Sequence, residues 1–212
     1  DAGGARKLVA AATEAGVVRP YAQEWMLLET LEGRYEAALS RLDQMPADSL
    51  ADPGRTGSWN TQFGYTPQEQ WYATLQGLLG DTETARASWE AAAAHLESLL
   101  KERPEDSRLH SALGIAYAGL GRKADAIEEG KLGVALLPIT REAYRGAFRV
   151  EDLARIYASV GEIDAAVDEL EVLHERPGRM TVGRLRLEPW WKPLRGQPRF
   201  EALIAKYEPA AE

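Results

Sequence analysis

The chain has 212 residues, of which 45% are hydrophobic and 27% charged, a balance typical of folded globular proteins and not of disordered segments. Its formal net charge of −8 argues against nonspecific binding to nucleic acid or to an anionic membrane, where a basic face is expected. The absence of cysteine excludes disulfides, thiolate metal sites and cysteine nucleophiles.

Helical patterns and helix-breaking residues divide the first half of the chain. The expected helices cover 5–15, 23–32, 35–44, 67–79 and 82–101, with breaks at Gly16, Pro20, Gly33, Gly80 and Pro104. Residues 45–66 interrupt this pattern with a stretch rich in Pro, Gly, Asp and Ser. A loop of this length inside a compact domain often carries function.

Three aromatic residues stand in or at the end of this long loop: Trp59, Phe63 and Tyr65. They either pin the loop to the rest of the protein or contact a ligand. The packing interpretation is favoured, because scattered aromatic side chains usually serve packing.

The second half of the chain continues the helical pattern to the C-terminus. The expected helices cover 107–120, 123–137, 150–160, 163–175, 181–187 and 200–207, and a short separate segment covers 140–146. Thr181 is expected to cap the helix that follows it. Because no stretch alternates between apolar and polar residues with a period of two, the sequence predicts an all-α fold.

A pattern of helix, glycine turn and helix recurs four times. The turn glycines are Gly33, Gly80, Gly121 and Gly161, about 40 to 47 residues apart. The residue five positions after each glycine is always alanine, at Ala38, Ala85, Ala126 and Ala166. Small residues at such positions let two helix axes approach closely, so the pattern predicts pairs of antiparallel helices.

This pattern resembles the tetratricopeptide repeat, whose signature is W-x2-L-G-x2-Y…A-x3-F…P. The third unit matches best, through Leu113, Gly114, Tyr117, Ala126 and Pro138. The first two units lack the tyrosine, and the spacing exceeds the family's ~34 residues. The resemblance implies an all-α, right-handed superhelical solenoid of antiparallel helix pairs with a C-terminal capping helix.

On this resemblance the chain is one domain with successive parts. They are an N-terminal helix at 1–18, repeat 1 at 19–46, the long loop at 47–66, repeat 2 at 67–104, repeat 3 at 107–138, repeat 4 at 147–178 and a C-terminal cap at 179–212.

The second half supports a narrower resemblance, to the C-terminal tetratricopeptide region of bacterial multidomain regulators. The residues that carry it are AIEEGKLGVALLP, VEDLARIYASVGEIDAAVDEL and LRLEPWWKPLRGQPRF. The usual ending there is close to L-R-L-D-P-x-W-D-P-L-R-x-D-P-R-F, and Glu188, Lys192 and Gln197 replace its aspartates. In such regulators this region follows a serine/threonine kinase, an adenylate cyclase or a winged-helix DNA-binding domain.

The first helix of each pair is expected to line a concave groove. The residues predicted there are Gln23, Leu27, Gln70, Thr74, Arg108, Ser111, Ile115, Glu151 and Arg155. A mixed polar groove suits an extended peptide or a partner helix, although a merely solvated surface fits the same residues equally well.

The segment PWWKPLR at 189–195 has two interpretations. It is an aromatic and basic binding patch, or a hydrophobic cap over the last helix pair. The cap is favoured, because the terminal unit of an open array otherwise exposes core surface.

No pattern in the sequence indicates catalysis or a cofactor. His95, His110 and His174 stand in different units without the three or four converging ligands that zinc needs, so no metal is expected. No glycine-rich phosphate loop and no GxSxG motif is present.

The sequence therefore predicts a non-enzymatic module that binds a protein or peptide partner or associates with itself as a homo-oligomer. No nucleic acid partner and no membrane insertion are expected. The alternative is a small-molecule sensor in which residues 45–66 form a lid. Because the chain starts at Asp1, we expect it to be a piece of a longer protein.

Overall fold

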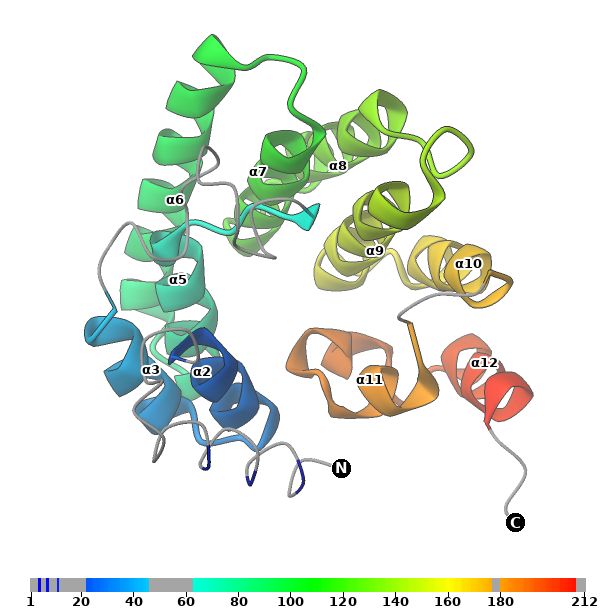
Figure 1. Ribbon diagram of the computed structural model, residues 1–212, viewed down its shortest axis with the longest axis horizontal. Coiled ribbons are helices and arrows are strands. Elements are labelled where there is room, and N and C mark those ends of the chain that lie inside the picture. The colour runs from blue at the N-terminus through cyan, green and yellow to red at the C-terminus, as the bar shows by residue number, and fades with distance from the viewer. Residues whose placement is uncertain are drawn as a thin grey trace. The chain divides into compact units, whose positions relative to one another are not determined.

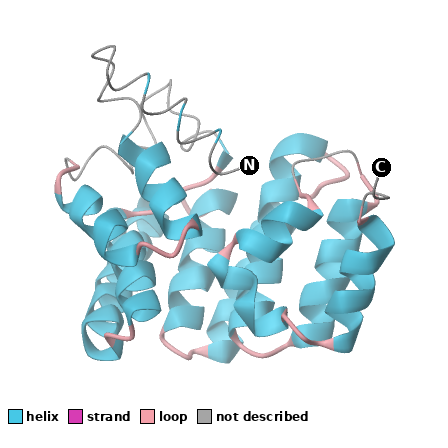
Figure 2. Cartoon of the chain, turned by 90° about the horizontal axis from the view of Figure 1, so that it is seen from below, coloured by secondary structure: helices cyan, strands magenta, loops and turns pink. Residues whose placement is uncertain are grey.

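The computed structural model describes residues 4, 7, 11, 22–45, 63–176 and 180–208 (Figure 1). These residues form helices joined by loops, and no strand occurs among them (Figure 2). The expected all-α class is confirmed for this part of the chain. The expected helix at 5–15 and most of the loop at 45–66 lie outside it.

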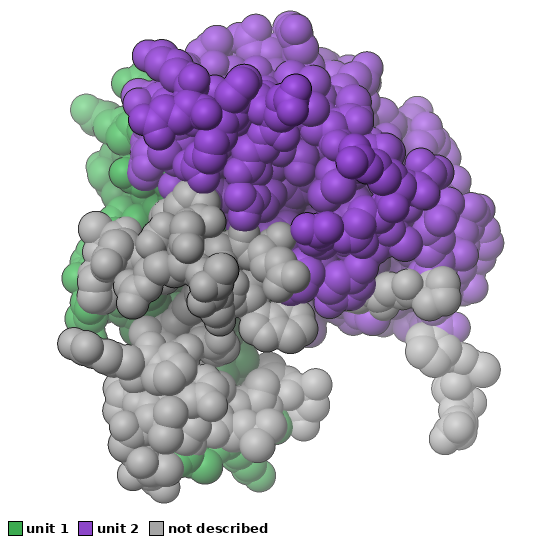
Figure 3. All heavy atoms as spheres, turned by 45° about the horizontal axis from the view of Figure 1, so that its top comes forward, with its two compact units in different colours: residues 1–62, 66–92 green, residues 63–65, 93–212 purple. Residues whose placement is uncertain are grey.

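The chain divides into two compact units, coloured separately in Figure 3. Unit 1 comprises residues 1–62 and 66–92, and unit 2 comprises residues 63–65 and 93–212. The boundary falls within the long helix α6 (Thr82–Glu102).

Unit 1 contains α2 (Ala22–Leu31), α3 (Tyr35–Asp43), α5 (Gln68–Leu79) and the first half of α6. A small core joins the first three of these helices, and its fully buried members are Met26, Ala38, Leu42 and Leu75. Gln68 also links α5 to α3, because its side-chain amide donates to the Leu42 carbonyl at 3.2 Å.

Unit 2 contains the rest of α6, then α7 (Ser107–Gly119), α8 (Lys123–Leu136), α9 (Ala143–Ser159) and α10 (Ile163–His174). The chain ends with α11 (Val182–Leu187), the 3-10 helix η2 (Pro189–Leu194) and α12 (Pro198–Tyr207). Within this unit α9 packs against α7, α8, α10 and η2. This central position makes α9 the element around which the polar groups described below are arranged.

The repeated turns are formed as the sequence predicts. Gly33, Gly80, Gly121 and Gly161 all have positive φ, between 73° and 85°. Only glycine adopts this left-handed conformation at no steric cost, so each of the four helices can end and reverse there. The four alanines that follow five residues later are all buried, as expected for close helix pairs.

The helices α7 and α8 approach each other closely through glycine. A methyl group added at Gly114 would lie 2.9 Å from the Ala126 carbonyl oxygen and 3.0 Å from the Gly130 nitrogen. It would also lie 2.7 Å from Cδ1 of Ile156 on α9. The three helices therefore meet at a point where no side chain fits.

The predicted start of the fourth helix pair was wrong. The separate segment at 140–146 and the helix at 150–160 are one helix, α9, which begins at Ala143. The Glu142 carboxylate caps it by accepting from the backbone N–H groups of Tyr144 and Arg145. Gly146 allows the helix to lie against the chain at Ile139, since a methyl group there would come within 2.7 Å of the Ile139 Cα.

The C-terminal segment packs onto the helices of unit 2. Trp191 and Leu194 of η2 are fully buried in one cluster with Leu153, Leu170 and Phe200. This burial is what the cap interpretation of PWWKPLR requires. Thr181 caps α11 as predicted, because its hydroxyl accepts from the Arg184 N–H at 3.3 Å.

Candidate functional site

The predicted groove residues of unit 1 differ in their exposure. Leu27 is 37% exposed, whereas Gln70 is only 3% exposed and its Oε1 has no hydrogen-bond partner among the described residues. The Thr74 hydroxyl donates to the Gln70 carbonyl of the same helix at 2.8 Å. Gln23 lies in α2, but its side chain is outside the described part.

In unit 2 the structure removes two predicted residues from any open surface. Ser111 is 1% exposed and faces α8, where its Oγ would lie 2.6 Å from a methyl group added at Gly133. Glu151 is 6% exposed and paired with Arg184 of α11. The prediction that these two side chains line an open groove was wrong, because α8 and α11 cover them.

The other predicted residues of unit 2 remain partly accessible. Arg108 donates from Nε and Nη2 to the Asp106 carboxylate at 2.9 and 2.6 Å. Ile115 is half-buried on α7. The Arg155 guanidinium lies over the Trp190 ring, 4.6 Å from its centroid.

Two of the three loop aromatics pack within unit 2. Phe63 stacks on Phe148 with ring centroids 5.2 Å apart and an interplanar angle of 16°. Tyr65 is buried, and its ring lies edge-on to His95. Trp59 and most of the lid proposed for a small-molecule sensor lie outside the described residues.

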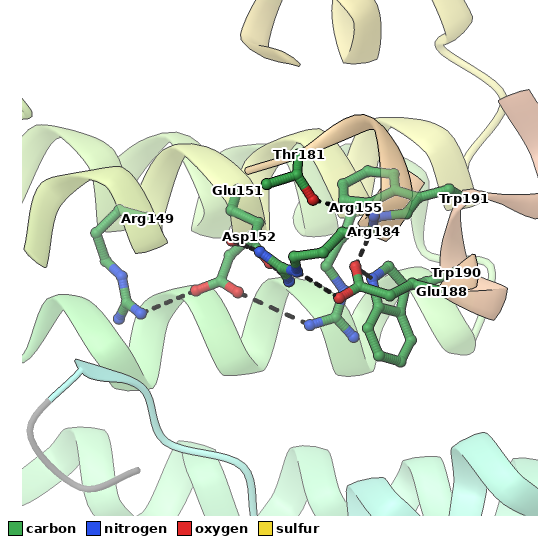
Figure 4. Close-up of polar contacts among 9 residues, drawn as sticks. All are labelled: Arg149, Glu151, Asp152, Arg155, Thr181, Arg184, Glu188, Trp190 and Trp191. Carbon is green, nitrogen blue, oxygen red and sulfur yellow. Dashed lines mark hydrogen bonds and ion pairs between the residues drawn. The ribbon is translucent and has the colours of Figure 1, made fainter. Parts of the chain in front are cut away.

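Two groups of charged side chains lie along α9, and they meet at Trp190, which contacts Arg155 of the first group and Glu188 of the second (Figure 4). We call the two groups together the α9 network, and its members are Arg149, Glu151, Asp152, Arg155, Arg184 and Glu188. Asp152 stands between two arginines of its own helix, with its carboxylate oxygens 2.9 Å from Arg149 Nη2 and 3.9 Å from Arg155 Nη1.

Arg184 links Glu151 of α9 to Glu188, the residue before η2. Its Nη1 and Nη2 donate to the two Glu151 oxygens at 3.2 and 2.7 Å, and its Nε donates to Glu188 Oε1 at 2.6 Å. Although burial opposes it, hydrogen bonding to Glu151 raises the pKa of Arg184 well above its usual range. A guanidinium held by two carboxylates in this way fixes α11 against α9.

Glu188 completes the network at the start of η2. Its Oε2 accepts from the indole N–H groups of both Trp190 and Trp191, each at 2.9 Å. The Glu188 carboxylate therefore has three donors on its two oxygens while it is only 7% exposed. It holds the tandem tryptophans in the orientation that buries Trp191.

Arg149 is the least satisfied charge of the network. It is 1% exposed, and its Nη2 donates to the Phe63 carbonyl at 2.8 Å. Its Nε and Nη1 have no hydrogen-bond partner among the described residues. Burial lowers the pKa of Arg149, and nearby Asp152 opposes that effect.

The chemistry available here is recognition of carboxylate, carbonyl and aromatic groups. Guanidinium donors and aromatic rings are the groups that bind peptides at protein interfaces. Within the described ranges, no group of three or more His, Asp or Glu side chains is placed to hold a metal ion. None of the helices seen in these ranges is long and apolar enough to cross a membrane.

Sequence reasoning missed Arg149, Arg184 and Glu188 as members of one network. A signal for part of it was present, because Arg149, Asp152 and Arg155 are spaced by three residues and so lie on one face of a helix. The spacing of Arg184 and Glu188 by four residues was a local signal for their pair. Nothing local pointed to Glu151 as the other partner of Arg184, because the two are 33 residues apart.

The described residues form a helical domain of paired helices in which charged side chains link α9 to α11 and η2. Residues 29–138 match the bacterial transcriptional activator domain family. The match spans more than half of the chain, and the chain belongs to this family. It is thus a helical regulatory domain of the kind found in bacterial regulators. The resemblance to a helical region of bacterial multidomain regulators is confirmed to this extent. No curated protein and no solved structure matches the chain significantly.

Family membership corrects one expectation. The prediction that nucleic acid has no part among the partners was wrong, because domains of this family belong to transcriptional activators that bind DNA. The acidic net charge of the chain was the basis for that prediction. Net charge describes this stretch of chain and not the regulator to which such a domain belongs.

Proposed function

We propose that this chain is a non-catalytic protein-interaction module of a bacterial transcriptional activator. It binds a peptide or a partner helix through the faces of its first helices, or it binds a second copy of itself. The single observation that carries this proposal is the fourfold recurrence of a helix pair closed by a left-handed glycine and a buried alanine.

The recurrence supports a stacked array of the tetratricopeptide type. In unit 2, α9 packs against both helices of the preceding pair, α7 and α8, and also against α10 of its own pair. Each pair in such an array buries its apolar face on the next pair and leaves one face of its first helix free. We propose the same stacking for all four pairs, with residues 179–212 as the cap.

The groups available for a partner are those that the helix pairs leave accessible. On the first helices they are Leu27, Thr74, Arg108, Ile115 and Arg155, and in η2 Trp190 lies beside Arg155. Arginine and tryptophan are the residues that most often dominate binding energy at protein interfaces. A face with such groups is suited to a protein ligand more than to a small polar metabolite.

The absence of cysteine from the chain offers a direct test. We would introduce single cysteines by Thr74→Cys and Ile115→Cys, attach a photocrosslinker and irradiate the purified chain with its binding partners present. Crosslinks from these positions to one protein, or to a second copy, are the expected result.

Ala135→Cys is the matched control, because Ala135 is exposed on α8, a second helix of its pair. We expect no crosslink from this position. Equal crosslinking from all three cysteines, or none from Thr74 and Ile115, would count against the proposed binding face. Light scattering of the same samples separates self-association from binding of another protein.

A further inference from the structure

A three-residue segment of the chain occupies the side of α9 in unit 2. The ring of Phe63 stacks on Phe148 and meets Tyr144 edge-on, at 5.2 Å in both cases. The Phe63 carbonyl accepts from Arg149 Nη2 at 2.8 Å. A ring received by aromatic side chains and a main-chain carbonyl held by an arginine are contacts that a peptide from a partner could also make.

Tyr65, two residues after Phe63, makes a second contact within unit 2. Its side chain is 5% exposed, its ring lies edge-on to His95, and its hydroxyl is 3.5 Å from His95 Nε2. Phe63 thus contacts α9 and Tyr65 contacts α6, with Gly64 between them in the chain.

The segment leaves the arginine only partly satisfied. Arg149 is buried, yet its Nε and Nη1 find no acceptor among the described residues. A buried donor without a partner is costly, so a ligand that supplied a carboxylate here would bind better than the segment that is present. The site is therefore better matched to an acidic and aromatic peptide than to Phe63–Gly64–Tyr65.

We propose that the face of α9 formed by Tyr144, Phe148 and Arg149 is a binding site for a partner segment that carries an aromatic side chain next to a carboxylate. The chain's own Phe63–Tyr65 segment occupies this site and must be displaced. This inference rests on the proposed function and names the site and the class of partner.

Because the Phe63–Tyr65 segment belongs to the same chain as the site, it competes with any peptide that is added. A tethered segment has an effective concentration in the millimolar range, so a free peptide competes poorly with it. The apparent affinity of a ligand falls by the fraction of protein in which the site is open. A substitution that weakens the contact of the Phe63–Tyr65 segment with α9 must therefore strengthen the binding of an added peptide.

The test uses two fluorescent peptides and measures their anisotropy with the full chain. The first is TQFGYTP, the sequence of residues 61–67, and the second is TEFGYTP, which adds one carboxylate. The proteins are the unchanged chain and Phe63→Ala, which removes a half-buried ring and leaves Tyr65 in place.

We expect Phe63→Ala to bind TQFGYTP at least fivefold more tightly than the unchanged chain, and TEFGYTP more tightly still. Adding Phe148→Ala should abolish the gain. Circular dichroism and melting temperature identify any variant that does not fold, and in that case Tyr144→Ala replaces Phe148→Ala, because Tyr144 is exposed.

Equal binding of TQFGYTP to the unchanged chain and to Phe63→Ala would overturn the proposal of an occupied site. Equal affinity for the two peptides would overturn the assignment of Arg149 as the contact for an anion. If the peptides fail but crosslinks form from Thr74 or Ile115, only this inference falls. If the peptides bind and no crosslink forms from Thr74 or Ile115, the binding face is confined to α9, and its proposed extension over the first helices of the second and third pairs fails instead.

Discussion

Replacing Glu188 with glutamine tests the α9 network, because this change keeps the shape of the side chain and removes its charge. The carboxylate accepts from Arg184 through one oxygen and from Trp190 and Trp191 through the other. An amide has only one oxygen, so its NH2 group must face either the arginine or the two indoles. At least one buried donor then loses its partner.

The magnitude follows from these contacts. A hydrogen bond to a charged group contributes about 1.5–3 kcal/mol, and an unsatisfied buried donor costs about 1–3 kcal/mol. Breaking a buried ion pair by removal of one partner typically costs about 3–5 kcal/mol. Since Glu188 and Glu151 share Arg184, we expect Glu188→Gln to lower the free energy of unfolding of unit 2 by about 3 kcal/mol.

Guanidinium unfolding monitored by tryptophan fluorescence measures this loss, since Trp190 and Trp191 of the network are two of the six tryptophans that give the signal. Glu128→Gln is the control, because Glu128 is exposed on α8 and such a change is usually within about 0.5 kcal/mol. If Glu188→Gln and Glu128→Gln have the same effect, the network does not hold α11 and η2 in place, and this reasoning is refuted.

Three further predictions concern packing and titration. Gly114→Ala should destabilise unit 2 by about 1–3 kcal/mol in chemical unfolding, because the added methyl group meets the backbone of α8 and Ile156; an unchanged midpoint would refute the close approach. Burial lowers the pKa of His174, which stacks on Tyr207. Stability should therefore fall as pH drops below about 6.5, where the unfolded chain takes up the proton first, and His174→Phe should remove this slope from melting temperatures measured against pH. Burial, with a hydrogen bond to Glu97, raises the pKa of Tyr117 to about 12. Stability should thus decline as pH rises from about 10 towards 12, and Tyr117→Phe should lessen that decline; an equal decline would contradict the assigned pKa.

The acidic net charge of the chain does not decide whether nucleic acid is among its partners. The acidic charge of the chain excluded nucleic acid partners on physical grounds that apply to nonspecific binding. The family belongs to activators that bind DNA, so an acidic net charge does not exclude DNA from the function of its members. The charge of one domain does not determine the partners of the protein that contains it.

The sequence by itself determined the local structure. The four turn glycines, the alanines five residues later and the Thr181 cap were all readable, because each depends on residues within about one or two helical turns. Most helix ends were predicted within one or two residues for the same reason. The start of α9 was the exception, although the Glu142 cap there is also local.

The tertiary structure alone decided which polar groups are exposed and which are buried. Glu151 and Ser111 have the spacing of groove residues, but α11 covers the first and α8 the second. Arg149 lies on the same face of α9 as Asp152, yet its contact with the Phe63 carbonyl joins residues 86 positions apart. Helical periodicity tells which side chains share a face, whereas the neighbour that covers this face is set by packing between elements distant in sequence.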